Sequence, residues 1–236
     1  MRFLKLLYLY ANIRFCLIIK LKLRMKRFVL FLFIGGLVFS ANAQELQVIK
    51  LNEPSKSGGS SVMEAFSHRK SGREISNKKL TTQDLSDLVW AAAGINRKDK
   101  DLRTAPSWRN YQDIDLYVCF PEGVYFYNAK DNTLEPFAKG NFYPLIATIQ
   151  PFVNDAPVIL LLVTDLSKMK DDDYDYRMVI AGIDAGIVSQ NISIFCAGKN
   201  MATVPRGFME KEELKKALKL KESQHIMLNH PVGYTK

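Results

Sequence analysis

The chain has 236 residues, of which 33 are Lys or Arg and 24 are Asp or Glu, for a formal net charge of +9. Residues 1–43 hold eight of the basic residues and none of the acidic ones, which leaves 25 against 24, or +1, for residues 44–236. The positive charge therefore belongs to the first segment, and the rest lacks the basic excess of a nucleic-acid-binding domain.

Residues 1–43 have the composition of an export signal. Lys26 and Arg27 precede an apolar run over residues 28–39, and small residues follow as far as Ala43. This order predicts a secretory signal cleaved after Ala43, and hence an exported protein, periplasmic or secreted. The run is shorter than the roughly 20 apolar residues that span a bilayer. Two alternatives stay open: Met25 as the true start, with residues 1–24 an upstream extension, and an uncleaved leader that anchors the protein to a membrane.

Residues 44–236 are long enough to bury a core. We expect an arm or linker over residues 44–60, because it ends in a stretch rich in Ser and Gly, and one domain over residues 61–236. Cys119 and Cys196 lie in apolar surroundings and are expected to be buried.

The three histidines are scattered along the chain and fit no metal-ligand spacing. They are His68, His225 and His230. No metal site is expected.

Helices open the predicted domain. A short helix is expected over residues 62–70. The sequence Thr81-Thr82-Gln83-Asp84 resembles a capping box and predicts the start of a second helix, which ends at Gly94. The polar stretch 97–110 contains proline and is interpreted as a loop.

The second half alternates strands and helices irregularly. Predicted strands cover residues 114–120, 124–127, 133–137, 157–164, 201–204 and 226–234, and predicted helices cover residues 143–152, 174–198 and 210–220. The strand over 157–164 is apolar throughout, which is typical of a strand covered on both faces. Without regular βαβ alternation, this order predicts an α+β sandwich with helices on both sides of a mainly antiparallel sheet.

The helix over residues 174–198 carries small residues on adjoining faces, at Ala181, Gly182, Ala185 and Gly186. Glycine costs about 1 kcal/mol in a helix relative to alanine, so two of them indicate a packing requirement. Two explanations stay open: close packing within the chain, and a central helix in a dimer.

Three segments carry chemistry. Residues 69–73 (Arg-Lys-Ser-Gly-Arg) offer the charge-assisted donors that a phosphate ester prefers, although a solvated basic turn has the same composition. Residues 103–112, with Trp108, could bracket a planar heterocycle or simply face water. Residues 203–207 form a turn whose backbone amides could face a ligand, because Gly207 allows a close approach.

The order of these motifs resembles the nitroreductase family, and the resemblance covers nearly all of residues 60–236. The matching segments are residues 69–73, 85–96, 103–107, 123–127, 184–191, 202–207 and 230–234. The nearest branch is that of the azoline-oxidising, SagB-type dehydrogenases and their exported relatives.

This resemblance implies a nitroreductase-like α+β sandwich that works as a domain-swapped homodimer with one FMN at each interface. It places Arg69, Lys70 and Ser71 on the FMN phosphate and ribityl chain, Arg73 near the pyrimidine edge, and Asn110 on the isoalloxazine, from this chain or its partner. The backbone N–H groups of Arg206 and Gly207 would meet the N5/O4 edge.

Two departures from the family pattern affect these expectations. The turn at residues 204–207 is about one residue shorter, and the chain stops at Lys236, where relatives often continue with a basic segment.

The implied activity is that of an FMN-dependent oxidoreductase with a ping-pong mechanism. It would transfer electrons to or from a nitro, quinone-like or other conjugated small molecule, with NAD(P)H as a candidate donor and with no catalytic side chain required. Two alternatives stay open: a non-catalytic flavin-binding or structural domain of the same fold, and a peptide azoline dehydrogenase.

Overall fold

Seven strands form one sheet in which every neighbouring pair is antiparallel. The computed structural model describes Lys22 and residues 45–236, so the predicted signal and its cleavage site lie outside the described residues apart from Lys22. Across the sheet the order is β1 (Ile49–Lys50), β6 (Thr133–Lys139), β5 (Gly123–Asn128), β4 (Ile114–Phe120), β7 (Val158–Asp165), β9 (Gln224–Tyr234) and β8 (Met201–Thr203).

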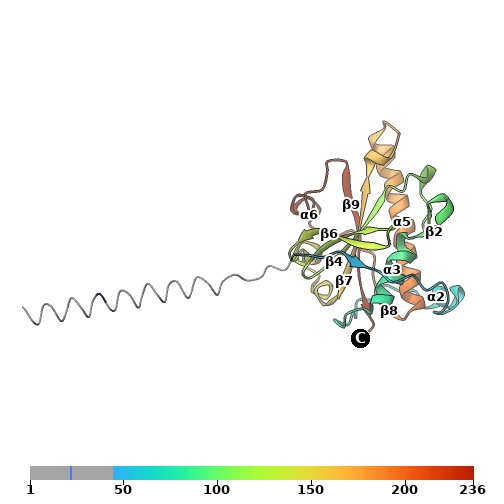
Figure 1. Cartoon of the computed structure of the whole chain (residues 1–236), viewed down its shortest axis with the longest axis vertical. Helices are drawn as coiled ribbons and strands as arrows, with labels where there is room; N and C mark the ends of the chain where they lie inside the picture. The colour runs from blue at the N-terminus through green and yellow to red at the C-terminus, as the bar shows by residue number, and fades with distance from the viewer. Residues whose placement is uncertain (1–21, 23–44) are drawn as a thin grey trace, which may run out of the picture. The chain divides into compact units, whose positions relative to one another are not determined.

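Helices lie on both faces of this sheet (Figure 1). They are α2 (Val62–His68), α3 (Thr82–Ala93), α4 (Tyr143–Ala147), α5 (Tyr174–Gly198) and α6 (Lys211–Ala217). The α+β sandwich with a mainly antiparallel sheet is therefore confirmed.

The central strands β4 and β7 are buried on both faces because their side chains alternate between two cores. In β7, Leu160 and Leu162 pack in the core shared with α3 and α5, whereas Ile159 and Leu161 pack in the core shared with α4 and α6. All eight residues of β7 are buried, as its long apolar run predicted.

The predicted helix starts are largely confirmed. Thr81 caps α3 by accepting a hydrogen bond from the Asp84 N–H, and the helix ends before Gly94. Helix α5 has the predicted bounds, and Asp173 caps it through the Tyr176 N–H. Among the described helices, α5 is the one that is long and apolar enough to cross a membrane, but half of that apolar stretch is buried inside the fold.

Two local predictions were wrong. Residues 97–110 are not one loop: they hold most of a small hairpin, β2 (Ile95–Arg97) with β3 (Leu102–Arg103), and two 3₁₀ turns, η1 (Lys98–Lys100) and η2 (Trp108–Asn110). The helix expected over 143–152 ends at Ala147, where Thr148 adopts φ 51°, and a 3₁₀ turn follows at η3 (Pro151–Asp155). The predicted arm includes the short edge strand β1, and the next residue, Leu51, is buried and donates its N–H to the Asn132 carbonyl.

Cys119 and Cys196 are free and buried, as expected. Burial raises the pKa of the Cys119 thiol to about 12 and also raises that of Cys196, so neither is a ready nucleophile.

Candidate functional site

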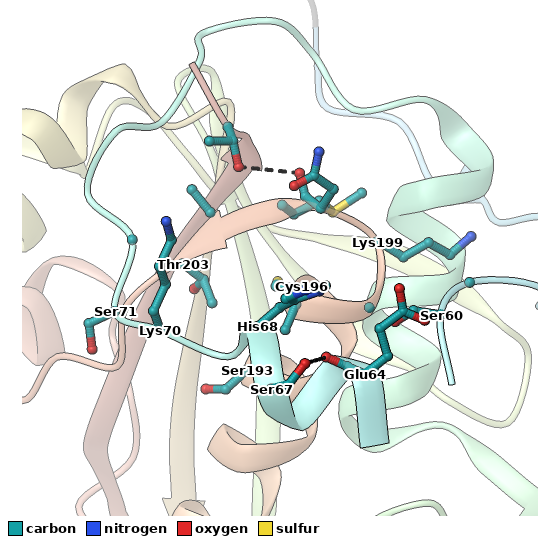
Figure 2. Close-up of a pocket in the computed structure, with 18 of the residues that line it drawn as sticks. Ser60, Glu64, Ser67, His68, Lys70, Ser71, Ser193, Cys196, Lys199 and Thr203 are labelled. Atoms are coloured by element: carbon teal, nitrogen blue, oxygen red, sulfur yellow. Dashed lines mark hydrogen bonds between the residues drawn. The ribbon is translucent and has the colours of Figure 1, made fainter. Parts of the chain in front are cut away.

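A cavity of about 1060 Å³ lies between helix α2, the loop that follows it, the C-terminal end of α5 and strand β8 (Figure 2). Lys70 and Ser71 stand on the loop beside Thr203 of β8, whereas Ser60 and Glu64 lie on the opposite side. The lining is rich in hydroxyl and charged groups: Ser60, Glu64, Ser67, His68, Lys70, Ser71, Arg73, Glu74, Ser193, Lys199, Thr203 and Thr235.

The loop over residues 69–74 is held against the sheet through Gly72. Its N–H donates to the Thr203 carbonyl at 2.8 Å, and a Cβ at this position would lie 3.1 Å from the Ala202 Cβ. Glycine therefore allows the loop to approach β8 closely. Lys70, Ser71 and Arg73, on either side of Gly72, are exposed.

The opposite wall depends on close packing between α2 and α5. The Ser60 N–H donates to the Gly198 carbonyl at 3.1 Å, and a Cβ on Gly198 would lie 3.3 Å from the Ser60 Oγ. Within residues 45–236 that buried hydroxyl oxygen has no hydrogen-bond partner. Ser60 therefore presents an unused polar group at the edge of the cavity.

Positive charge in the cavity comes mainly from the loop. The Lys199 ammonium points away from Lys70 (Figure 2) and lies 3.5 Å from the buried Asp87 carboxylate, so its charge is largely compensated. No ion pair within the described part of the chain occupies Lys70 or Arg73. The loop cations are thus available to a ligand.

Behind the cavity, a buried histidine joins three elements. The two ring nitrogens of His230 (β9) lie 2.8 Å from the Ser189 Oγ of α5 and 3.2 Å from the Thr203 Oγ1 of β8. Burial lowers the pKa of His230 to about 3, so the ring is neutral. This group, the Ser189–His230–Thr203 link, fixes a hydroxyl that lines the cavity.

The sequence and fold comparisons agree with one another. A model described as "Nitroreductase family" matches residues 66–234. The chain belongs to the nitroreductase family.

Individual relatives span most of this nitroreductase-family chain. MJ1384 of Methanocaldococcus jannaschii, named as a nitroreductase, is 26% identical over 174 residues, which cover 70% of this chain and 86% of the relative. A solved structure from Ralstonia eutropha JMP134, titled as a nitroreductase, is 31% identical with a TM-score of 0.76, covering 82% of this chain and 91% of that one.

The NADPH:FMN oxidoreductase from Vibrio harveyi, solved with NAD⁺, shares the fold at 16% identity and a TM-score of 0.56. The alignment covers 74% of this chain and 69% of that one. Family membership and such neighbours support a general flavin-dependent oxidoreductase function.

The structure brings together part of the predicted nitroreductase-type site. Lys70, Ser71 and Arg73 line the cavity. Arg69 is exposed at the C-cap of α2 and lies next to this lining without belonging to it. Lys236 pairs with Asp155 at 2.9 Å.

The expected backbone donors at residues 206 and 207 require a correction. The Arg206 N–H already donates to the Asn229 carbonyl at 2.9 Å, in an isolated bridge between the two residues. Its guanidinium is buried and bonds to Gln150 Oε1, Asn229 Oδ1 and main-chain carbonyls of α4. The backbone N–H donation to the flavin ring that was expected of both residues is therefore left to Gly207 alone.

Asn110 lies at the other end of α5. Its neighbour Trp108 donates a backbone hydrogen bond to Asp184, whereas Ala197 and Lys199 border the cavity. Asp184 and Ala197 are thirteen positions apart, which corresponds to about 20 Å of helix. A single chain therefore does not bring Asn110 and Lys70 to the same part of one ligand.

Sequence reasoning missed several lining residues. Ser60 had been placed in the arm, and Ser193 and Lys199 gave no signal beyond their positions on or after a predicted helix. A polar residue on the buried face of a helix, as Ser193 is, was the one available clue.

Proposed function

We propose that this protein is an FMN-dependent oxidoreductase that works as a homodimer on a conjugated small molecule. The observation that carries the proposal is the cavity beside Gly72. In it the nitroreductase fold presents Lys70 and the Ser71 hydroxyl opposite Ser60 (Figure 2), and Arg73 also lines the cavity.

The cavity fits the phosphate and ribityl parts of FMN. A phosphate ester prefers charge-assisted donors, and Lys70 supplies an ammonium group that no ion pair holds within the described residues. Ser60 contributes a buried hydroxyl oxygen that has no partner among residues 45–236, and Ser71 and Thr203 add hydroxyl groups for a polyol chain. The volume of about 1060 Å³ leaves room for a large cofactor.

Bound FMN would supply the redox chemistry, by accepting and returning two electrons. The chain's own groups would bind and orient it. A cation at Arg73 stabilises negative charge that develops nearby, and the Gly207 N–H donates to no acceptor within residues 45–236. The reaction requires no nucleophile or general base from the protein.

A homodimer completes the site. The exposed face of α5 carries Tyr176, Val179, Ile183 and Gly186 at a spacing of three and four residues, which aligns them in one stripe. Cβ atoms added at Gly182 or Gly186 would meet none of the described residues within 4 Å, so packing among these residues does not explain either glycine. A second copy on this stripe can bring its own Asn110 loop towards the cavity of the first.

The proposed flavin chemistry indicates which electron donor and which kind of substrate to test. The Vibrio harveyi relative is named as an NADPH:FMN oxidoreductase, which makes NAD(P)H the donor to test first. We propose a nitro, quinone-like or other conjugated molecule as acceptor, with a ping-pong mechanism. The export signal proposed for residues 1–43 places this reaction in the periplasm or outside the cell.

An absorbance spectrum of the purified protein tests the proposal. Bands of oxidised FMN that bleach when NADPH is added without oxygen are the expected result. A colourless protein that rejects added FMN would contradict the proposed cofactor.

A second candidate is a flavin-binding domain without turnover. The hydrogen bond from the Arg206 N–H to Asn229 favours it, because it removes one of the two expected donors near the flavin ring. FMN bands that no nicotinamide, quinol or dithiol donor bleaches would support this candidate over the reductase.

A further inference from the structure

Two buried carboxyl groups meet where α5 crosses the sheet. Asp113, just before β4, is fully buried, and Asp184 of α5 is 3% exposed. The Asp184 carboxyl lies within hydrogen-bonding reach of Asp113, whose Oδ2 also accepts a hydrogen bond from the Thr164 hydroxyl at 2.8 Å. Asp113 Oδ1 meets no donor group of the described residues. Two ionised carboxylates in contact repel each other, and a proton on Asp113 removes this repulsion.

The charged groups around the pair do not replace that proton. From β3, Arg103 is near enough to feel the Asp113 charge, but its guanidinium hydrogen bond goes to the Ile114 carbonyl. Lys168 bonds to Asp115 of β4 at 2.6 Å. The nearby groups of β7 and α5, Asp165 and Arg177, bond to Ser167 and to the Leu166 carbonyl.

Asp184 also holds a loop. Its Oδ2 accepts a hydrogen bond from the Trp108 N–H at 3.0 Å, and the Trp108 ring packs edge-on against Tyr176 of the same helix at 5.5 Å. Next in the chain, Arg109, Asn110 and Gln112 have φ values of 49°, 56° and 48°. Such left-handed backbone is costly for residues other than glycine and persists only where other contacts enforce it.

We propose that Asp184 is a positioning residue for residues 108–112, and that the Asp113–Asp184 pair holds this loop only while Asp113 retains its proton. Loss of the proton places two negative charges in contact inside the fold, which separates the carboxylates and weakens the Trp108 attachment. The effect on flavin rests on the function proposed above, in which Asn110 of this loop meets the cofactor.

The protonation of Asp113 changes within the physiological pH range. Burial, the hydrogen bond with Asp184 and its charge raise the pKa of Asp113 to about 7. A group with this pKa is about 90% protonated at pH 6 and about 10% protonated at pH 8. The loop is therefore held at pH 6 and released at pH 8.

Tryptophan fluorescence tests the loop directly, because the chain has two tryptophans, Trp90 and Trp108. In a Trp90→Phe background, the emission of Trp108 is expected to shift to longer wavelength between pH 6 and 8. Asp113→Asn should abolish this transition, because the amide supplies a permanent donor to Asp184. Asp184→Ala should give the long-wavelength emission at every pH.

Two further variants keep the test informative if Asp113→Asn or Asp184→Ala does not fold. Thr164→Val removes a hydrogen bond that favours the charged carboxylate, and it should move the transition to higher pH. Asp165→Asn, a neighbouring acid whose pKa is lowered, should leave the transition unchanged. Constant Trp108 emission in the parent, or a transition that survives Asp113→Asn, would overturn the proposal.

The affinity for FMN tests the link to function. Its Kd should be several-fold weaker at pH 8 than at pH 6, and this difference should shrink in Asp113→Asn; ionisation of the FMN phosphate affects both proteins equally. A Trp108 transition with no such difference between the two proteins would contradict the link. Failure of FMN to bind at either pH would sink the proposed function and leave the fluorescence result intact.

Discussion

Two buried polar groups attach helix α5 to the sheet, and they differ in kind. Towards the cavity, Ser189 reaches the neutral His230, whose partners are hydroxyl groups that can either donate or accept. One turn and a half earlier, Asp184 reaches Asp113, an acid whose pKa is raised to about 7 by its burial and by the neighbouring Asp184 carboxyl. The contacts at the cavity end of α5 therefore hold at neutral pH, whereas the contact at the loop end holds only while Asp113 keeps its proton.

The largest effect is expected from disrupting the proposed dimer, because the cavity of one copy and the Asn110 loop of the other form one proposed site. Ile183 is 54% exposed in the stripe between them, so Ile183→Asp leaves the folded chain intact. In a dimer it buries an unpaired charge in each copy, and an unpaired buried polar group costs about 1–3 kcal/mol. We expect the dimer Kd to rise by about 100-fold or more, measured by analytical ultracentrifugation.

Flavin should be lost together with the dimer. Ile183→Val is the matched control, since it keeps the stripe apolar and should leave both unchanged. A monomeric Ile183→Asp protein that still binds FMN with the parent affinity would show that the loop end does not belong to the site.

A smaller effect is expected at the cavity end. Lys70→Ala removes one charge-assisted contact to the phosphate, a contact that contributes about 1.5–3 kcal/mol, so the Kd for FMN should rise about 10- to 100-fold. Riboflavin lacks the phosphate, and its Kd should hardly change. Isothermal titration with both ligands measures the ratio.

Lys199 provides the control for this prediction, because it borders the same cavity but pairs with Asp87. Lys199→Ala should weaken FMN less than Lys70→Ala does. Equal losses for FMN and riboflavin in Lys70→Ala would place the phosphate elsewhere.

The pH dependence of stability sharpens the contrast between the two polar groups. His230 has its pKa lowered from 6.5 to about 3, so the unfolded chain takes up the proton first and stability falls as pH drops from about 6.5 towards 3. Asp113 has its pKa raised from 3.8 to about 7, so the folded chain keeps the proton and stability falls as pH rises from about 4 towards 7.

Urea unfolding midpoints between pH 3 and 8 check both signs. Asp113→Asn should flatten the decline towards neutral pH, and His230→Gln should flatten the decline towards acid. His230→Gln should also cost about 1–3 kcal/mol at pH 8, since it leaves a buried hydroxyl unpaired. The same slope in either variant as in the parent would mean that another group carries it.

The sequence predicted those parts of the fold in which a local pattern and the tertiary structure agree. The capping residues at Thr81 and the apolar run of β7 are read from neighbours in the chain, and the motif at residues 69–73 reached the cavity in the structure. The break at Thr148 and the small hairpin after α3 carry no comparable local pattern.

The contacts between distant segments could not be predicted. Asp113 and Asp184 lie 71 positions apart in the chain, and only the packing of α5 across the sheet brings them together. The bond between Arg206 and Asn229 likewise depends on how the turn after β8 folds back on β9. A match to a family motif predicts which residue type stands at each position, but it does not predict the hydrogen-bond partners of that residue in this chain.

The smallest effect is expected at Gly182, and its sign separates the two explanations of the small residues on α5. In a single copy the methyl group of Gly182→Ala meets no neighbour within 4 Å in the part of the chain that the structure describes, and alanine favours the helix by about 1 kcal/mol. At a close dimer contact the added methyl group forces the two helices apart and opposes that gain. We expect Gly182→Ala to raise the Tm at low protein concentration and to lower the dependence of Tm on concentration. A Tm gain of the same size at every concentration would show that this face of α5 meets no second copy.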